Sequence, residues 1–224
     1  MVTLESGDSL PVMCYSQSTK RTIQTASHAG KYALSFTTGA LLRQESVKLA
    51  ELFLEHGDWN LVREVAVQNN ILQTRTAKSS VRLFQEISSR LKSLNDDELT
   101  LLVEGTVQDQ GHVLWLALCR RYKFIADFAV EVLREKLLSL QPELHYEDFE
   151  VFFNKKAEWH PELEAIKPIT KVKARGMLFK MLREADLLSA DNRIHPAMLS
   201  PLFLEAIDSE GHADVMFFPT LQSQ

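Results

Sequence analysis

The stretch that most constrains the fold is residues 73–94, QTRTAKSSVRLFQEISSRLKSL, because its apolar residues recur at helical spacing. A polar stripe runs beside the apolar one, and Thr76 is a candidate N-cap just before the periodic part. The pattern predicts an amphipathic helix with one buried face and one exposed face. The apolar stripe consists of Ala77, Ser80, Phe84, Ile87, Leu91 and Leu94, and the polar stripe of Lys78, Arg82, Gln85, Ser89 and Lys92.

Comparable helical patterns with start and stop signals recur along the chain. Thr38 is a candidate N-cap for a helix over residues 39–56 that Gly57 would end, and Asp58 would cap the next helix. Asn95 with Glu98 forms a capping-box pattern. Because the 224 residues include only 8 Gly and 7 Pro, we expect an all-α globular protein. The further expected helices span about residues 108–121, 123–140, 146–159 and 170–187, with one more beginning at Ser200-Pro201.

Polarity and charge divide the chain into four predicted regions. Residues 1–31 are polar and lack an apolar period, which predicts a flexible N-terminal arm. Residues 32–94 combine two short helices, a turn and a helix that starts with basic residues, which favours a helix-turn-helix region. Residues 95–164 are expected to form the central helical core. Residues 165–224 pair a basic helix, capped by Thr170, with a short hairpin or tight loop, the pattern of a winged helix-turn-helix.

Two of the predicted helices carry basic residues without compensating acids, although the net charge of the chain is −5. An ordinary solvated helix face pairs Glu with Lys at i, i+4, and no acid occurs in residues 167–183. A solvated face explains the first helix equally well when it is taken alone. Its repetition favours a surface that meets phosphates, to which a helix N-terminus adds N–H donors. The candidate DNA-binding residues are Arg75, Thr76, Lys78, Ser79, Arg82, Lys171, Lys173, Arg175, Lys180 and Arg183.

Sequence signatures of other functions are missing. The chain has no P-loop, zinc-protease motif, nucleophile elbow or dinucleotide loop, so we expect no enzyme and no cofactor. Cys14 and Cys119 have no ligand-type neighbours, which argues against a metal site and favours the reducing cytoplasm. The longest apolar run, residues 113–119, is far shorter than the roughly 18 residues of a transmembrane helix, and no signal-peptide pattern is present. Without a heptad seam, a monomer is expected.

Aromatic residues do not interleave with the basic ones in the way that stacks single-stranded bases, so a duplex is the favoured nucleic acid. We expect Trp59, Trp115 and Trp159 to anchor the core or contacts between helices.

Residues from about 33 to 205 resemble the BrxA family, a core component of BREX bacteriophage-exclusion systems. The resemblance rests on an extended pattern in two parts of the chain. It implies a small, all-helical, non-enzymatic cytoplasmic protein with two helix-turn-helix elements that binds double-stranded DNA. It also implies action beside a methyltransferase, an ATPase and other BREX proteins in marking host DNA and blocking phage replication. The matching features are Thr38-Gly39-x-Leu41-Leu42 leading to Glu45-Ser46, the Trp59 helix, Asn70-x-Leu72-Gln73, Arg75-Thr76 before the helix ending Arg90-Leu91, and KVKARGMLFKMLREADLL…LSPLF.

Two alternatives stay open at this point. The basic faces could instead bind acidic surfaces of partner proteins, which would make the chain an assembly module of the BREX complex. A helical RNA-binding module, like the antitermination factor NusB, is the other. The residues themselves point only as far as duplex binding, and phage defence comes from the resemblance.

Overall fold

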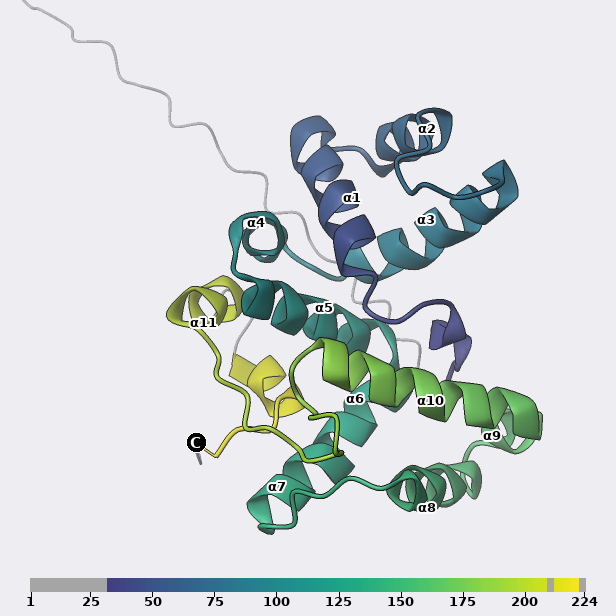
Figure 1. Ribbon diagram of the computed structural model, residues 1–224, viewed down its shortest axis with the longest axis vertical. Helices are drawn as coiled ribbons and strands as arrows, with labels where there is room; N and C mark the ends of the chain where they lie inside the picture. The colour runs from purple at the N-terminus through teal and green to yellow at the C-terminus, as the bar shows by residue number, and fades with distance from the viewer. Residues whose placement is uncertain (1–31, 209–211, 222–224) are drawn as a thin grey trace, which may run out of the picture.

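The computed structural model describes residues 32–208 and 212–221, and the predicted all-α fold is confirmed (Figure 1). The predicted arm, residues 1–31, lies outside the described residues. Within the described residues, three helical segments are not α-helical: the 3-10 helices η1 (Ser35–Thr37) and η3 (His212–Phe217) and the π-helix η2 (Ala129–Arg134). The α-helices are α1 (Arg43–His56), α2 (Trp59–Gln68), α3 (Ala77–Leu91), α4 (Asp96–Glu104), α5 (Val107–Arg121), α6 (Lys123–Phe128), α7 (Glu135–Leu138), α8 (Tyr146–Ala157), α9 (Pro161–Glu164), α10 (Pro168–Glu184) and α11 (Pro201–Asp208).

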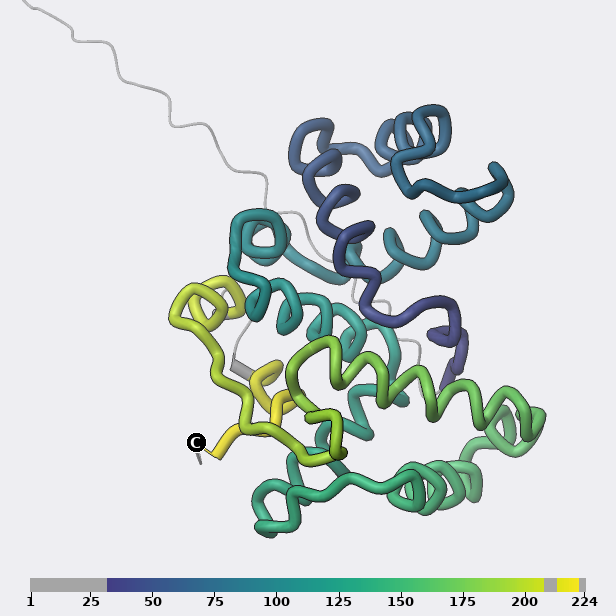
Figure 2. Tube along the Cα trace, viewed as in Figure 1, coloured from purple at the N-terminus to yellow at the C-terminus, as the bar shows by residue number. Residues whose placement is uncertain are grey.

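Helix α5 lies at the centre of the molecule. Residues 111–119 are buried without interruption, as expected for a helix that is apolar on all sides. Helices α1, α3, α4, α6 and α10 pack against it, as does η3. The core extends from Tyr32 to Phe218 and so runs across the predicted region boundaries at 94/95 and 164/165. The chain path in Figure 2 shows α1, α2 and α3 grouped above α5.

Several predicted helix ends are confirmed, because they depend on local hydrogen bonds. The side chains of Asp58 and Thr76 accept hydrogen bonds from backbone N–H groups in the first turns of α2 and α3. Asn95 and Glu98 form the predicted capping box at the start of α4. Gly57 ends α1 in the left-handed conformation, at φ 67°.

Two predicted helix starts are wrong. Helix α1 begins at Arg43 rather than Gly39, because Gly39 and Leu42 have φ values of 78° and 55°, which no right-handed helix contains. Helix α10 begins at Pro168, so Thr170 lies inside its first turn and Lys167 takes the N-cap position. Proline favours the first helical position because its ring fixes φ and it has no N–H to leave unpaired.

The predicted hairpin is present as a tight turn. Leu188 and Ile194 form an antiparallel bridge, and the Ser189 N–H donates to the Arg193 carbonyl at 2.9 Å. Arg193 also bridges Glu143, which precedes α8, so the turn packs back against the body of the protein. Helix α11 then starts as predicted, with the Ser200 hydroxyl accepting from the Phe203 N–H at 3.0 Å.

Candidate nucleic-acid interface

The first basic face is built by the opening turns of α3. Thr76 caps the helix, since its Oγ1 accepts the Ser79 N–H at 3.1 Å and lies 2.9 Å from the Ser79 Oγ. Arg75, Lys78 and Arg82 follow at helical spacing around this end, and all five residues are exposed. The structure therefore brings the first group of predicted site residues together on one surface. We call this surface the α3 face; it consists of Arg75, Thr76, Lys78, Ser79 and Arg82.

The charge of the α3 face is not neutralised by acids. Within the part of the chain that the structure describes, Arg75, Lys78 and Arg82 form no ion pair with a carboxylate, and Arg82 donates only to the Thr38 hydroxyl, at 3.3 Å. The nearest acid that follows in sequence, Glu86, is engaged with Arg90 and with the Tyr122 hydroxyl at 2.7 Å. The face thus presents three positive charges beside a helix N-terminus, where backbone N–H groups add to the positive potential.

Arg90, at the far end of the same helix, has a structural role. Its guanidinium is buried, donates to the Ala40 carbonyl at 2.6 Å and pairs with Glu86 at 2.8 Å. It joins α3 to the segment before α1 and is not available to a ligand.

The second basic face lies on α10, and two of its predicted residues are already paired. The Glu150 carboxylate of α8 accepts from Lys171 at 2.5 Å and from Arg175 at 2.8 Å. Both cations also lie over aromatic rings of α8, Lys171 over Phe153 and Arg175 over Tyr146. These contacts fix α10 to α8 and lower the net charge that this part of the helix presents to solvent.

The remaining predicted residues of α10 differ in how far they are available. Lys173 is exposed and forms no ion pair among the described residues, while Lys180 is exposed and pairs loosely with Glu184 at 3.7 Å. Arg183 is half-buried and donates to the Asn192 side chain of the hairpin turn at 2.6 Å. Gly176 lies between them with open space where a Cβ would stand, so the backbone is accessible there. Lys173, Gly176 and Lys180 form the open part of the α10 face.

The segment of residues 35–41, before α1, contacts both basic faces. Arg82 of α3 donates to the Thr38 hydroxyl in this segment. Helix α10 packs against η1, and its Glu184 carboxylate accepts from the Leu41 N–H at 2.8 Å. Figure 1 shows the first turns of α3 and α10 on the same side of the view, with η1 between them. The predicted basic residues therefore come from two helices that share a common support.

Three further exposed cations lie near the basic faces but outside the predicted set of DNA-binding residues. Arg63 on α2 and Lys167 at the N-cap of α10 form no ion pair among the described residues, and Lys92 lies 5.9 Å from the centre of the Trp59 ring. A helix capped by Thr170 would leave Lys167 outside the predicted basic face, whereas the structure places Lys167 at the N-cap. The signal that could have found it is the Lys-Pro step, since Pro marks the first helical residue.

Two of the three tryptophans predicted as packing anchors are packed in the structure, and one is exposed. Trp115 is buried and donates to the Phe217 carbonyl at 3.0 Å, and Trp59 stacks on Phe53 at 4.4 Å. Trp159, by contrast, is 81% exposed, because the helix that was expected to hold it ends at Ala157.

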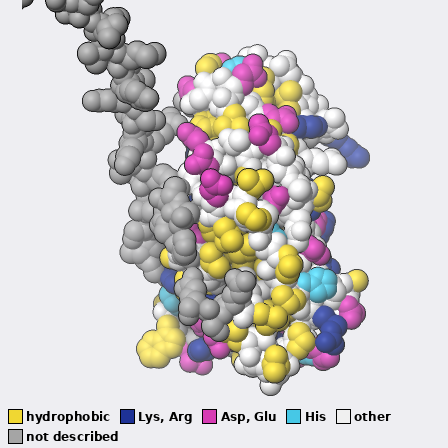
Figure 3. Space-filling model, turned by 90° about the vertical axis from the view of Figure 1, so that its left-hand side faces the viewer, with side chains coloured by type: hydrophobic (Ala, Val, Ile, Leu, Met, Phe, Trp, Pro, Cys, Tyr) yellow, Lys and Arg dark blue, Asp and Glu magenta, His cyan; other side chains and the backbone are white. Residues whose placement is uncertain are grey.

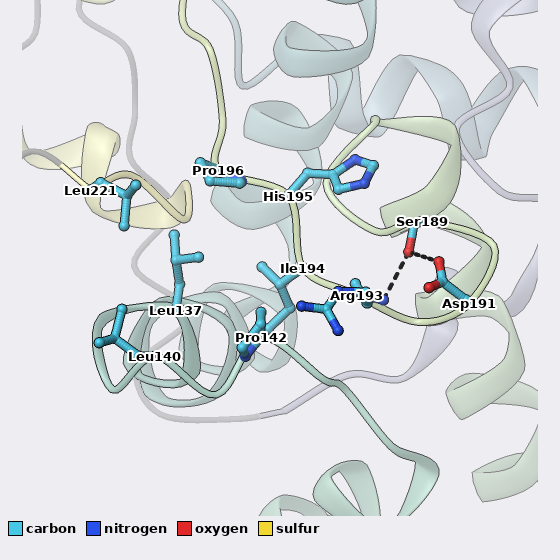
Figure 4. A pocket seen from close by; sticks show the side chains of 10 residues that line it. All are labelled: Leu137, Leu140, Pro142, Ser189, Asp191, Arg193, Ile194, His195, Pro196 and Leu221. Atoms are coloured by element: carbon cyan, nitrogen blue, oxygen red, sulfur yellow. Dashed lines mark hydrogen bonds between the residues drawn. The ribbon is translucent and has the colours of Figure 1, made fainter.

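A hollow of about 470 Å³ lies between α7 and the hairpin turn (Figure 4). Polar groups in its lining already have partners: the Ser189 hydroxyl donates to Asp191 at 2.5 Å and accepts from the Arg193 N–H at 2.8 Å. Burial raises the pKa of the Cys119 thiol, which lies in the core away from this hollow. Across residues 32–208 and 212–221, no cluster of three metal-ligating side chains occurs, and no helix is long and apolar enough to cross a bilayer.

Comparisons with known proteins agree with the resemblance drawn from the sequence. A family model described as BrxA matches residues 30–211. The chain is 28% identical over 155 residues to the BREX protein BrxA of Escherichia coli O9:H4 (strain HS), which covers 69% of this chain and 73% of that protein. It is 24% identical over 127 residues to the BREX protein BrxA of Bacillus cereus (strain H3081.97), which covers 57% of this chain and 64% of that protein.

Among solved structures, the chain is similar to a crystal structure of an uncharacterized protein from Magnetospirillum magneticum. The TM-score is 0.74 at 18% sequence identity, over 86% of this chain and 100% of that chain. This likeness supports the fold alone.

Proposed function

The chain belongs to the BrxA family, and on that premise we propose that it serves a BREX phage-defence system as a non-enzymatic accessory protein that binds double-stranded DNA. It acts in the cytoplasm as a monomer, without metal or cofactor. Its partners in this proposal are duplex DNA and other BREX proteins, among them the methyltransferase and the ATPase.

The observation that carries the proposal is the α3 face. Three exposed cations stand around a capped helix N-terminus, and none of them forms an ion pair with a carboxylate in the part of the chain that the structure describes. Guanidinium and ammonium groups bind phosphate oxygens through charge-assisted hydrogen bonds, and backbone N–H groups at the helix start can complete the contact. Arg75, Lys78 and Arg82 supply the charge, and Thr76 and Ser79 supply hydroxyl donors.

The α10 face adds a smaller contribution. Lys173 and Lys180 are open to solvent, whereas Lys171 and Arg175 share the Glu150 carboxylate and Arg183 holds the hairpin turn. A phosphate can compete for Lys171 and Arg175 only by displacing Glu150. We therefore assign the first contact with DNA to α3 and a supporting contact to α10 and the hairpin, which takes the place of a wing.

Binding of this kind is dominated by phosphates and depends steeply on salt. With about six phosphate contacts, affinity falls by about 10³ between 50 and 200 mM salt, because the bound cations release counterions from the duplex. Contacts to phosphates carry no sequence information, so one lost cation weakens binding to all duplexes alike.

The test is a salt series of binding to a random-sequence duplex, followed by fluorescence anisotropy. We expect binding at 50 mM salt that weakens steeply as salt rises and collapses in Lys78→Glu/Arg82→Glu. A matched control is Lys123→Glu/Lys155→Glu, which makes the same change of charge at exposed lysines of α6 and α8. It should bind nearly as the unaltered protein does. Absence of binding at 50 mM salt, or equal losses in both variants, would rule out the α3 face as a DNA-binding surface.

The second candidate function is a protein assembly module. It is supported by the exposed Lys173 and Lys180, which carboxylates of a partner can pair in the way that Glu150 pairs Lys171 and Arg175. Co-purification with other BREX proteins after nuclease treatment, lost in Lys173→Glu/Lys180→Glu, would support it. A structured RNA that competes better than duplex DNA would instead support the NusB-like reading.

A further inference from the structure

A groove of about 390 Å³ runs between α4 and α11, away from both basic faces. Its floor is apolar and consists of Leu101 of α4 with Leu202 and Ala206 of α11. Its rim carries three carboxylates, Asp97, Glu104 and Glu205. We call this surface the α4–α11 groove.

Two leucines of α11 are exposed although the helix already buries an apolar side. Phe203 and Ile207 face the core, while Leu202 on one flank of the helix is 62% exposed, Leu204 on the other flank is 42% exposed, and Glu205 is exposed between them. Exposed apolar side chains rimmed by polar ones mark surfaces that another molecule can cover. Figure 3 looks onto the side of the molecule that carries α4 and α11, where acidic side chains border a patch of hydrophobic ones. The flank of α11 that carries Leu202 and lines the groove therefore has the character of a surface that a partner covers.

The acidic rim is not neutralised within the part of the chain that the structure describes. Among residues 32–208 and 212–221, Asp97, Glu104 and Glu205 form no ion pair, and all three are exposed. Asp97 lies in the first turn of α4, where the helix dipole favours a negative charge. Glu104 is the last residue of α4, where the dipole disfavours one, and no cation of the described chain offsets it. The rim thus holds negative charge that the fold itself does not use.

From this combination we propose that the α4–α11 groove docks a short amphipathic segment of a partner protein, with leucine-sized side chains toward Leu101 and Leu202 and lysine or arginine toward the rim. The apolar floor provides the contact area, and the carboxylates select a basic segment and reject nucleic acid. Because α11 has eight residues, it is about 12 Å long and matches about two turns of a bound helix. This docking does not rest on the proposed DNA binding, since the groove shares no residue with either basic face.

The probe is a fluorescein-labelled 14-residue amphipathic peptide built from leucine and lysine, titrated with the full chain and followed by anisotropy. We expect saturable binding that weakens at least about tenfold when Glu104→Lys/Glu205→Lys reverses the rim, since opposite charges then become like charges. Leu202→Ser should also weaken peptide binding, because it removes an apolar side chain from the floor of the groove. A peptide with glutamate in place of lysine should not bind. In the unaltered protein, backbone amide signals of Leu101, Gly105 and Leu202 should shift on titration.

A matched control is Glu147→Lys/Glu158→Lys, which reverses two exposed carboxylates, one in α8 and one just after its end, and should leave the affinity unchanged. Helical circular dichroism and the unfolding midpoint verify that each variant is folded. Equal affinity in the rim variant, or shifts confined to other helices, would refute the proposal. If the chain dimerises without peptide, and the rim variant abolishes this dimerisation, the groove binds a second copy of the chain. That result would also overturn the proposal.

Discussion

Arg120 holds both carboxylate oxygens of Glu98, with its two terminal nitrogens each 2.8 Å from one oxygen. Glu98 is fully buried, and the same guanidinium also contacts Asp214 of η3 at 2.6 Å. The pair therefore joins α4, α5 and η3 around one cation. Burial lowers the pKa of Arg120, but the hydrogen bonds and charge of Glu98 and Asp214 outweigh it and raise the pKa overall.

Replacing Arg120 should strongly destabilise the protein. Arg120→Met leaves Glu98 buried beside an apolar side chain, and removing one partner of a buried ion pair costs about 3–5 kcal/mol. Urea unfolding of the variant and the unaltered protein measures the difference. Arg121→Met, next along the chain on the same helix, removes a cation that lies over the Tyr122 ring, and should cost about 1 kcal/mol or less. Similar losses in the two variants would contradict the special role of Arg120.

Two glycines should respond oppositely to alanine. At Gly105 a Cβ would stand 2.4 Å from the Leu101 carbonyl oxygen, so Gly105→Ala forces the turn between α4 and α5 apart and should cost about 1–3 kcal/mol. At Gly176, inside α10, a Cβ meets nothing within 4 Å. Gly176→Ala should therefore gain about 0.5–1 kcal/mol, because alanine favours the helix and loses less backbone freedom on folding. Thermal or urea unfolding of both variants checks the signs.

His112 should make stability depend on pH. It is buried in α5 with its ring edge-on to Phe203 and Phe218, at centroid distances of 5.9 and 5.6 Å, and its Nδ1 has no hydrogen-bond partner. Burial lowers its pKa, and the charges of Asp109 and Asp186 offset this only in part. Below about pH 6.5 the unfolded chain binds a proton at His112 that the folded chain does not. Stability should therefore fall as pH decreases, by up to about 1.4 kcal/mol per pH unit.

Urea unfolding between pH 7.5 and 5.5 measures this loss. His112→Phe should reduce the pH dependence over that range, because the variant has no group at this position to protonate. An unchanged slope in His112→Phe would show that other groups cause the loss.

Features that depend on interactions between residues close in sequence could be predicted, and features that depend on distant residues could not. The caps at Asp58, Thr76 and Asn95 rely on hydrogen bonds within three residues, and the structure confirms them. The α3 face was also predictable, because its cations lie within two turns of one helix. The late start of α1 was not, since the segment before it is held by Glu184, far away in the sequence.

The same limit applies to the candidate site on α10. Glu150 neutralises both Lys171 and Arg175 because α8 packs beside α10. No local sequence pattern reveals this packing. The burial of Arg90 likewise follows from the Ala40 carbonyl and from Glu86, which is itself held by Tyr122. A count of basic residues along a helix therefore overstates how many of them are available to a ligand.

The open part of the α10 face should contribute modestly to DNA binding. Lys173→Ala/Lys180→Ala removes two exposed ammonium groups, and the slope of log affinity against log salt should become shallower by about 1.8, at 0.9 per phosphate contact. The loss should be the same on duplexes of different sequence. Anisotropy across a salt series measures it, and an affinity equal to that of the unaltered protein would remove α10 from the interface.

Glu150 should weaken DNA binding by occupying two of the basic residues of α10. Glu150→Gln removes the carboxylate that Lys171 and Arg175 share, so both cations become available to phosphates, and the salt slope should steepen by up to about 1.8. Affinity at 50 mM salt should rise accordingly. Glu131→Gln is the matched control, because Glu131 also holds two lysines, Lys155 and Lys156, but on a different surface. A gain in Glu150→Gln alone assigns Lys171 and Arg175 to the interface. Equal gains in both variants would mean that only the net charge of the chain matters.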